Sequence, residues 1–456
     1  MAEWLKAHAW RACGLQKGLV GSNPTPSVLI ASFAASYVGP AAPPPPAGVH
    51  PVQGKQQLAL PSPLPVSLMI CAFLTCPGQA TGPASRDTSI GPVVREMCGK
   101  SVALLGEPRM HGFGKTLELK VELVRRLIDE CHYDAVFFES GIYDFLNIQE
   151  LVRSGQDVTD TTIAAAIGGL WASQEVRRLI PFLRARVTSG SLYLGGLDDQ
   201  LGRGTWAQNA MPAALAAYLA GDQKARCLAV LRQYMLWQYP SDAPYGPQDK
   251  ARILGCLDSI DAQSRATGAP GRAAHQAMIA GMKRLFDRDF QNVPAGTDET
   301  TLSWNERDRS MYLNFRWLES QLPPHSKVIV WAATVHAAKQ LSAVPGDESE
   351  IPLGFYVHQD LGNRAFALGF SAYSGSYAMA GRPVQPLPPA PRGSLEDRVF
   401  AGRDSETVYL SRSDLRKIGP VAARPLGTNF TTARWDRVLD GLLIVRREQA
   451  PEYLRP

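Results

Sequence analysis

The sequence lacks the motifs of the most familiar hydrolases. Gly-x-Ser-x-Gly, which places a serine nucleophile on a sharp strand-to-helix turn, occurs nowhere in the 456 residues. His-Glu-x-x-His, the helical zinc motif of metalloproteases, is absent as well. These absences disfavour a serine-based α/β-hydrolase and a zincin, so any hydrolysis by this chain would depend on an activated water.

An excess of charge of one sign is also missing. The 47 basic and 42 acidic residues leave a net charge of +5 that is spread thinly along the chain. No run of Lys and Arg is interleaved with aromatic residues in the way that would track a nucleic-acid backbone. Nucleic-acid binding is therefore not expected. The 45% hydrophobic and 20% charged content is that of a globular protein with a sizeable core.

The first 90 residues contain almost no acidic side chains and run through the prolines of Pro40 to Pro46. Such a composition cannot support a packed core. We therefore expect residues 1–90 to be a low-complexity leader that is disordered or removed. The stretch 21–24, Gly-Ser-Asn-Pro, is what one frame of the T-arm of a transfer-RNA gene encodes. Our hypothesis is that Met1 to about Pro26 is such a translated gene and that the true start lies downstream.

The stretch from Leu58 to Leu74 resembles a short secretory signal. Lys55 precedes it, and small residues suited to cleavage, such as those at 83–85, follow it. It is too short and too rich in proline for a stable membrane span. We expect export to the periplasm or the medium, with a cytoplasmic location as the alternative.

Four cysteines follow the leader, an even number that suits a disulfide framework. Cys98 and Cys131 each lie a few residues ahead of an expected strand. Parallel strands that one helix connects begin at the same sheet edge, so these two thiols would come within disulfide reach. Cys227 and Cys256 lie in successive helical segments and would staple a helical pair. The alternative is four buried free thiols, because cysteine is small and apolar.

The pattern from residue 98 onward indicates an α/β fold. Short apolar runs at 102–106 and 134–139 are typical of parallel strands that are buried on both faces. Between them, a helix near 115–131 has apolar residues at helical spacing, with Lys120 assigned to its polar side. This order predicts a right-handed βαβ crossover, whose two strands we expect to be neighbours.

The rest of the chain extends this pattern. Helical segments are expected at about 161–187, 205–290 and 306–320, strands at 191–195 and 327–332, a strand or two within 357–370, and an antiparallel or edge element near 439–445. The predicted fold class is α/β, with a mostly parallel sheet and flanking helices. A helical subdomain is expected as an insertion at about 205–300 of a domain that spans 91–456.

Four acid/base side chains follow the carboxyl ends of these strands, where open parallel sheets bind their ligands. Glu107 and His111 follow the first strand, Glu139 ends the second, and His336 follows the strand at 327–332. Two carboxylates and two imidazoles on one rim predict acid/base or metal chemistry. The structural alternatives are a hydrogen bond from His111 to a loop carbonyl and a salt bridge for Glu139.

The same residues resemble the erythromycin esterase family over roughly residues 98 to 448. The resemblance is carried by Gly106-Glu107, His111-Gly112, Phe138-Glu139, Arg307-Asp308 with Met311 and Asn314, Val330-Trp331-Ala332 with His336, Pro388 to Glu396, and Trp435-Asp436 to Leu442-Leu443. It implies a hydrolase without a metal or other cofactor that cleaves a small-molecule ester or lactone. With a macrolide as substrate, the product would be a ring-opened antibiotic and the biology would be antibiotic resistance.

The resemblance also implies a role for each candidate. His111 would be the general base for water, Glu107 and Glu139 the orienting carboxylates, and His336 the acid or electrophilic partner.

Three further residues are weaker candidates for substrate contact. Lys115 is either an oxyanion partner or part of the solvated first turn of its helix. Asp198 either orients an imidazole or caps a helix. Arg307 pairs with a rim carboxylate more readily than it contacts substrate.

The chain departs from the family pattern at two places. Three residues, rather than the usual two, separate Glu107 from His111, and Ala333 and Thr334 stand where the family commonly has His-Asn. A changed substrate or reduced activity is therefore expected. Two rival functions stay open: a metal-dependent hydrolase on the same Glu/His site, and a non-catalytic protein that binds a ligand in the same pocket.

Overall fold

The computed structural model describes residues 90–202, 204–235, 247–267, 271–289 and 299–454. The leader expected at 1–90, with its secretory signal, lies outside the described residues except for Ile90. No helix of the described ranges combines the length and the apolar character that crossing a membrane requires.

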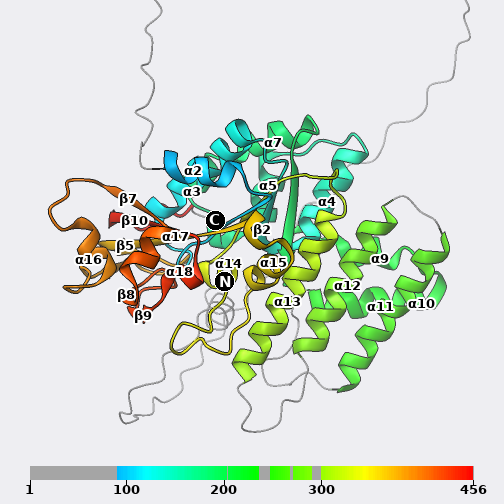
Figure 1. Cartoon of the computed structure of the whole chain (residues 1–456). Coiled ribbons are helices and arrows are strands. Elements are labelled where there is room, and N and C mark those ends of the chain that lie inside the picture. The colour runs from blue at the N-terminus through cyan, green and yellow to red at the C-terminus, as the bar shows by residue number, and fades with distance from the viewer. Residues whose placement is uncertain (1–89, 203, 236–246, 268–270, 290–298, 455–456) are drawn as a thin grey trace, which may run out of the picture. The chain divides into compact units, whose positions relative to one another are not determined.

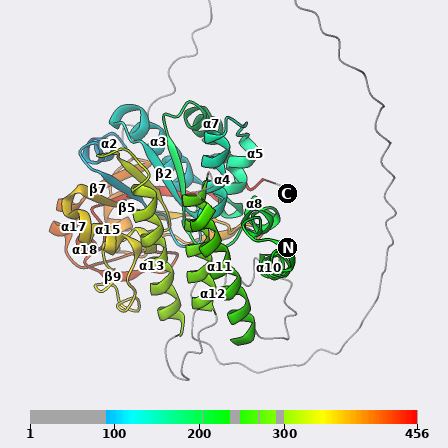
Figure 2. The ribbon, with the colours of Figure 1, turned by 90° about the vertical axis from the view of Figure 1, so that its right-hand side faces the viewer.

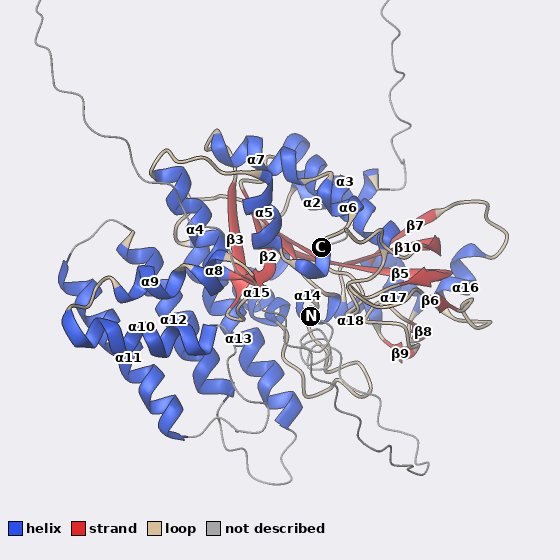
Figure 3. Ribbon diagram, turned by 180° about the vertical axis from the view of Figure 1, so that it is seen from behind, coloured by secondary structure: helices blue, strands red, loops and turns tan. Residues whose placement is uncertain are grey.

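An eight-stranded sheet organises the described part of the chain (Figure 3). Its strand order is β3 (Tyr193–Asp198), β2 (Ala135–Gly141), β4 (Val328–Trp331), β1 (Val102–Leu105), β5 (Ala365–Tyr377), β10 (Gly441–Glu448) and β7 (Thr407–Ser411), with β6 (Gln385–Leu387) paired to the end of β5. From β3 to β10 all neighbours run parallel, whereas β7 and β6 are antiparallel to their partners. The predicted mostly parallel sheet is confirmed.

One prediction about strand placement was wrong. β4 lies between β1 and β2, which are therefore not neighbours; Val328 pairs with both Val102 and Ala135. The antiparallel or edge element expected near 439–445 is β10. It is antiparallel to β7, as one alternative predicted, but it lies inside the sheet because its other side pairs in parallel with β5. Each of these strands is an apolar run buried on both faces, so the sequence pattern carries no signal for which strands pair.

Helices cover both faces of the sheet (Figures 1 and 2). Ala103 and Leu105 face a layer made by α2 (Gly91–Cys98), α3 (Gly114–Cys131), α5 (Asp160–Ile167), α6 (Gln174–Arg177) and α7 (Ile180–Thr188). Val102 and Leu104 face the opposite layer, which includes α15 (Leu353–Leu361) and the helices inserted between β3 and β4. Beside the edge strand β3, α4 (Ile142–Arg153) contributes to both layers.

The inserted helices lie where the sequence predicted a helical segment. They are α8 (Trp206–Asn209), α9 (Met211–Ala216), α10 (Gly221–Met235), α11 (Pro247–Thr267), α12 (Arg272–Asp289) and α13 (Glu299–Glu319). The last of them, α13, packs against β3 and returns the chain to the sheet. At the other end of the sheet lie α16 (Leu395–Phe400), α17 (Arg412–Ile418), α18 (Trp435–Val438) and the hairpin of β8 (Val421–Ala423) and β9 (Thr431–Ala433). The short helix α14 (Thr334–Ala337) follows the central strand β4 and packs against α15 and β5.

Both expected disulfides are present. Cys98 is bonded to Cys131, with their Cα atoms 4.8 Å apart, and Cys227 to Cys256, at 5.5 Å. The first bridge joins the ends of α2 and α3 at the edge where β1, β4 and β2 begin. Lys327, directly before β4, donates from Nζ to the carbonyl oxygens of Cys98 at 2.7 Å and Cys131 at 2.6 Å. The residue that leads into β4 therefore also stabilises the two helix ends that the bridge joins.

Removal of the first bridge should lower stability. In the variant Cys98→Ala/Cys131→Ala, the free energy of unfolding should fall by about 2–4 kcal/mol, because the cross-link no longer restricts the unfolded chain. Chemical denaturation under oxidising conditions measures the difference, with Cys227→Ala/Cys256→Ala as the matched control within the helical insertion. A wild-type protein whose unfolding midpoint is unaffected by a reducing agent would contradict both bridges.

Candidate active site

The predicted site residues gather at the carboxyl ends of four adjacent strands. Glu107 follows β1, Glu139 lies near the end of β2, and Asp198 is the last residue of β3. β4 ends at Trp331 and leads through a short turn into α14, which carries His336. The ends of these strands form one continuous rim of buried charge.

Glu107 is almost completely buried, with 1% of its surface exposed. Its Oε1 accepts hydrogen bonds from Nδ1 of His111 at 2.8 Å and from Nε1 of Trp171 at 2.6 Å. Its Oε2 lies 3.2 Å from Nζ of Lys120. Burial would raise the pKa of Glu107, but Lys120 and His111 outweigh burial and lower it, so the group stays a carboxylate.

Lys120 is a site residue that the sequence analysis placed on the wrong face of its helix. Its side chain is fully buried, and its ammonium group donates to the carbonyl oxygen of Ala332 at 3.3 Å and lies 4.3 Å from the ring centre of Trp331. Burial lowers the pKa of Lys120 to about 8, although the charge of Glu107 opposes this. Lys120 lies three residues after Leu117 and four before Val124, so helical spacing alone would have placed it on the buried stripe.

His111 presents one free ring nitrogen. The residue is 6% exposed, and its ring packs edge-to-face against Trp171 with centroids 5.1 Å apart. Because Nδ1 donates to Glu107, the lone pair of the neutral imidazole lies at Nε2. Within the described ranges, no residue forms a hydrogen bond with Nε2. That nitrogen is available to a water or a substrate.

Arg307 of α13 joins the ends of β2 and β3. Its Nη2 donates to Oε1 of Glu139 at 3.0 Å and to Oδ2 of Asp198 at 2.7 Å, and its Nε donates to the same Asp198 oxygen at 3.1 Å. This is the rim pairing that the sequence favoured for Arg307. Burial would raise the pKa of Glu139, but the adjacent His336 and Arg307 hold it well below its usual range.

His336 lies between two carboxylates. Its Nδ1 is 2.9 Å from both carboxylate oxygens of Asp308, and its Nε2 is 3.2 Å from Oε1 of Glu139. Burial would lower the pKa of His336, but Asp308 and Glu139 raise it to about 10. The ring is therefore an imidazolium at neutral pH.

One contact of His336 conflicts with that charge. Nη1 of Arg307 lies 3.0 Å from Nε2, which would be a hydrogen bond only if the ring were neutral. Two flanking carboxylates favour the charged ring, since an opposite charge within about 4–6 Å stabilises the ionised form. We therefore infer that the Nε2 proton of His336 is directed at Glu139 in a hydrogen bond. The Arg307 contact then places two cations beside the Glu139 carboxylate that both of them bind.

The turn after β4 connects the two groups of charges. The backbone N–H of Thr334 donates to the carbonyl oxygen of Glu107 at 2.6 Å, and that of Ala333 donates to Oε2 of Glu139 at 2.8 Å. Glu107 and Glu139 thus lie on either side of β4, rather than side by side as expected. The side chains of Ala333 and Thr334 are buried and supply no titratable group.

Lys115 is not brought together with the other candidates. Its Nζ pairs with Oε2 of Glu118 at 3.2 Å in the first turn of α3, and 39% of its side chain is exposed. This placement matches the solvated first turn that was the alternative to an oxyanion partner.

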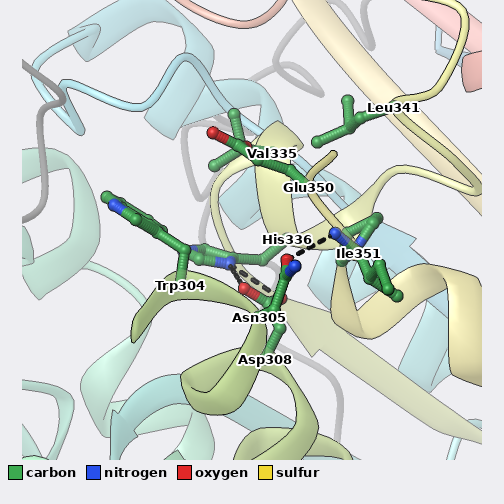
Figure 4. A pocket seen from close by; sticks show the side chains of 9 residues that line it. Trp304, Asn305, Asp308, Val335, His336, Leu341, Glu350 and Ile351 are labelled. Carbon is green, nitrogen blue, oxygen red and sulfur yellow. Dashed lines mark hydrogen bonds and ion pairs between the residues drawn. The ribbon is translucent and has the colours of Figure 1, made fainter. Parts of the chain in front are cut away.

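A shallow hollow opens beside His336 (Figure 4). About 190 Å³ of empty space, part of it open to solvent, is lined by Trp304, Asn305, Asp308, Val335, His336, Leu341, Glu350, Ile351 and Pro352. The Trp304 ring stacks on His336 with centroids 5.6 Å apart. Because this space is partly open to solvent, the described residues form a surface hollow here and do not enclose a ligand.

The rim does not resemble a metal centre. Among the residues that the structure describes, no three His, Cys, Asp or Glu side chains are arranged to hold a metal ion. The carboxylates are instead paired with Lys120, Arg307 and the two imidazoles.

Fold and rim together define an α/β protein with an acid/base site at the carboxyl ends of parallel strands. The family model for erythromycin esterase matches residues 128–447. The chain belongs to the erythromycin esterase family, a family of hydrolases. The matched range begins after Glu107 and His111, so these two residues are supported as a pair by their hydrogen bond and not by the family match.

Known proteins share the fold at low sequence identity. A Bacillus subtilis (strain 168) protein named "Putative hydrolase YbfO" is 23% identical over 341 residues, which cover 68% of this chain and 74% of that protein. A solved Bacillus cereus structure is 15% identical with a TM-score of 0.60, covering 80% of this chain and 93% of that one. The structure of a succinoglycan biosynthesis protein is 12% identical with a TM-score of 0.61, covering 80% of this chain and 92% of that one. The structure of a mutant of the erythromycin esterase EreC in its open conformation is also 12% identical, with a TM-score of 0.54, covering 80% of this chain and 94% of that one.

Replacement of Lys120 by Met should destabilise the protein strongly. The change leaves the buried Glu107 carboxylate without its cation, which typically costs about 3–5 kcal/mol in the free energy of unfolding. Lys115→Met, on the exposed side of the same helix, is the matched control and should change stability by at most about 0.5 kcal/mol. Denaturant titration at pH 7 measures both. Equal stability of the two variants would show that Lys120 does not stabilise Glu107.

The stability of the fold should depend on the charge of His336. Because its folded-state pKa is raised from 6.5 to about 10, its stabilisation is fully present below about pH 6.5 and is lost as pH rises through 10. The loss is on the order of 4 kcal/mol, at about 1.4 kcal/mol for each pKa unit. Denaturant titrations at pH 6 and pH 10 should show this fall in the wild type and a smaller fall in His336→Asn. Identical falls would contradict an imidazolium at this position.

Proposed function

We propose that the protein hydrolyses an ester or lactone of a small molecule with a water that His111 activates. The observation that carries the proposal is the arrangement of the His111 ring: Nδ1 is bound to a buried carboxylate, while Nε2 has no partner among the described residues. A carboxylate partner fixes the tautomer and the orientation of an imidazole. This is the arrangement that a general base for water requires.

The proposed reaction uses both halves of the rim. A water donates a proton to Nε2 of His111 as its oxygen attacks the carbonyl carbon of the ester. Negative charge then develops on the carbonyl oxygen, where the imidazolium of His336 would stabilise it. As the tetrahedral intermediate collapses, the leaving alkoxide takes a proton from His336 or from protonated His111.

The other rim residues would position these two rings. Glu107, supported by Lys120 and Trp171, orients His111. Glu139 holds His336 in this proposal, with Arg307 and Asp198 as its support, so that these last two act by positioning rather than by substrate contact. Lys115 remains a candidate for substrate contact only if a ligand extends along α3.

Substrate and location are further parts of the proposal. Family membership favours a macrolide, with antibiotic resistance as the biology. The presence of Ala333 where the family commonly has His favours an ester or lactone other than a macrolide. The two disulfides support an exported protein, because such bonds persist in oxidising compartments.

Hydrolysis of a panel of simple esters, lactones and macrolides by the full chain tests the proposal. Turnover should resist a chelator, and His111→Ala should lower kcat/KM by about 10²–10⁴-fold, the usual contribution of a general base. His275→Ala is the matched control, since His275 pairs with the hydroxyl of Tyr218 in the helical insertion, and should retain wild-type activity.

Two other results would favour the rival functions. Activity that a chelator abolishes and a divalent metal restores would indicate a metal-dependent hydrolase. Absence of turnover across the panel, with binding of a panel compound retained, would indicate a ligand-binding protein.

A further inference from the structure

We propose that Tyr453 is a positioning residue for the Glu107–His111 pair, and that it acts through the backbone of the His111 loop. The proposal rests on the function proposed for His111. Tyr453 lies in a short segment, residues 449–454, that we call the tail strap. The strap contacts two loops, and each loop supplies one hydrogen-bond donor to Oε1 of Glu107.

The backbone of His111 needs support from its surroundings. Its φ of 54° lies in the left-handed region, which residues with a side chain seldom adopt. A residue held there typically costs on the order of 1–2 kcal/mol, and it persists only where neighbouring structure fixes it. The conformation matters because it directs the ring toward Glu107.

The tail strap supplies part of that support. The Tyr453 hydroxyl donates to the carbonyl oxygen of Ala378 at 3.1 Å and lies 3.5 Å from that of His111. The backbone N–H of Gly114 donates to the carbonyl oxygen of Gln449 at 2.7 Å. Ala378 in turn donates from its N–H to the carbonyl oxygen of Gly112 at 3.0 Å. The loop from 111 to 114 is thus fixed by the strap and by the chain just after β5.

Only glycine allows this approach at residue 112. A Cβ atom there would lie 1.9 Å from the carbonyl oxygen of Ala378. The two backbones are therefore in direct contact, and the Tyr453 hydroxyl lies where they meet.

The same strap holds the loop that carries Trp171. Leu454 donates from its N–H to the carbonyl oxygen of Ala172 at 2.8 Å, and Gln174 donates to that of Glu452 at 2.9 Å. The N–H of Glu452 also donates to Oε1 of the buried Glu175 at 3.1 Å. The strap therefore sets the distance between the loop of His111 and the loop of Trp171, whose donors meet at one carboxylate oxygen.

The hydroxyl can act as a donor throughout the working pH range. Burial, followed by the negative charges of Glu107 and Glu175, raises the pKa of Tyr453 above its ordinary value. Ionisation of this group would place a third negative charge beside two buried carboxylates. The phenol thus stays neutral.

Tyr453→Phe in the full chain tests the proposal, with Tyr133→Phe as the matched control. The Tyr133 hydroxyl also donates to a backbone carbonyl, that of Met97 at 2.8 Å, but it lies at the opposite end of α3. Tyr453→Phe should lower kcat for the best ester by about 10-fold and leave KM within about 2-fold, because the base is displaced while the substrate pocket is intact. Tyr133→Phe should leave both constants unchanged.

A spectroscopic measurement separates this proposal from the proposed function. The indole N–H resonance of Trp171, assigned with Trp171→Phe, reports its hydrogen bond to Glu107 without any substrate. In Tyr453→Phe this resonance should shift upfield as that bond lengthens, whereas in Tyr133→Phe it should stay in place. If the wild type hydrolyses no ester, the proposed function fails while this shift still decides whether Tyr453 positions the pair.

An unchanged indole resonance together with wild-type kcat in Tyr453→Phe would overturn the proposal. Should that variant not fold, Glu175→Ala loosens the strap at its other end without contact to His111. Glu175→Ala should give the same upfield shift of the Trp171 indole resonance. An unchanged resonance in this variant would equally overturn the proposal that the tail strap positions the pair.

Discussion

Burial of the Glu107 carboxylate is the constraint on which one half of the rim depends. A charged group that is 1% exposed would cost several kcal/mol if it were left unpaired. Its partners are His111 in the following loop, Lys120 on α3 and Trp171 in a turn much further along the chain. These partners meet only after α3 has packed on the sheet and the Trp171 turn has closed over it. Packing of this face and pairing of Glu107 with His111 are therefore achieved together.

The other half of the rim depends on a cation that the sheet's own loops do not provide. Glu139 and Asp198 end adjacent strands, and Arg307, which pairs with both, arrives on α13 after the whole helical insertion. This gives the insertion a structural role at the site, because its last helix returns the guanidinium to the rim. It also explains why Arg307 is held within the rim: two of its nitrogens donate to carboxylates and the third contacts His336.

The sequence predicted those features that depend on local pattern. Strands buried on both faces are short apolar runs, and amphipathic helices have periodic apolar residues. The ends of the predicted strands give Glu107, His111, Glu139 and His336 as candidates. Pairing of strands depends on tertiary contacts, so the sequence does not predict the position of β4 between β1 and β2. A lysine usually indicates an exposed position, so the sequence does not predict the burial of Lys120. Trp171 had no local signal, since it meets Glu107 only through the fold.

The two imidazoles differ in their number of carboxylate partners, and this difference underlies the separate roles proposed for them. His336 has Asp308 at one nitrogen and Glu139 at the other, so both nitrogens carry protons and the ring is a fixed cation. A ring in that state has no lone pair with which to accept a proton from water. His111 has a single carboxylate at Nδ1, so a neutral ring keeps a lone pair at Nε2. In the proposed reaction, His111 would therefore act as the base, and His336 would contribute charge or a proton.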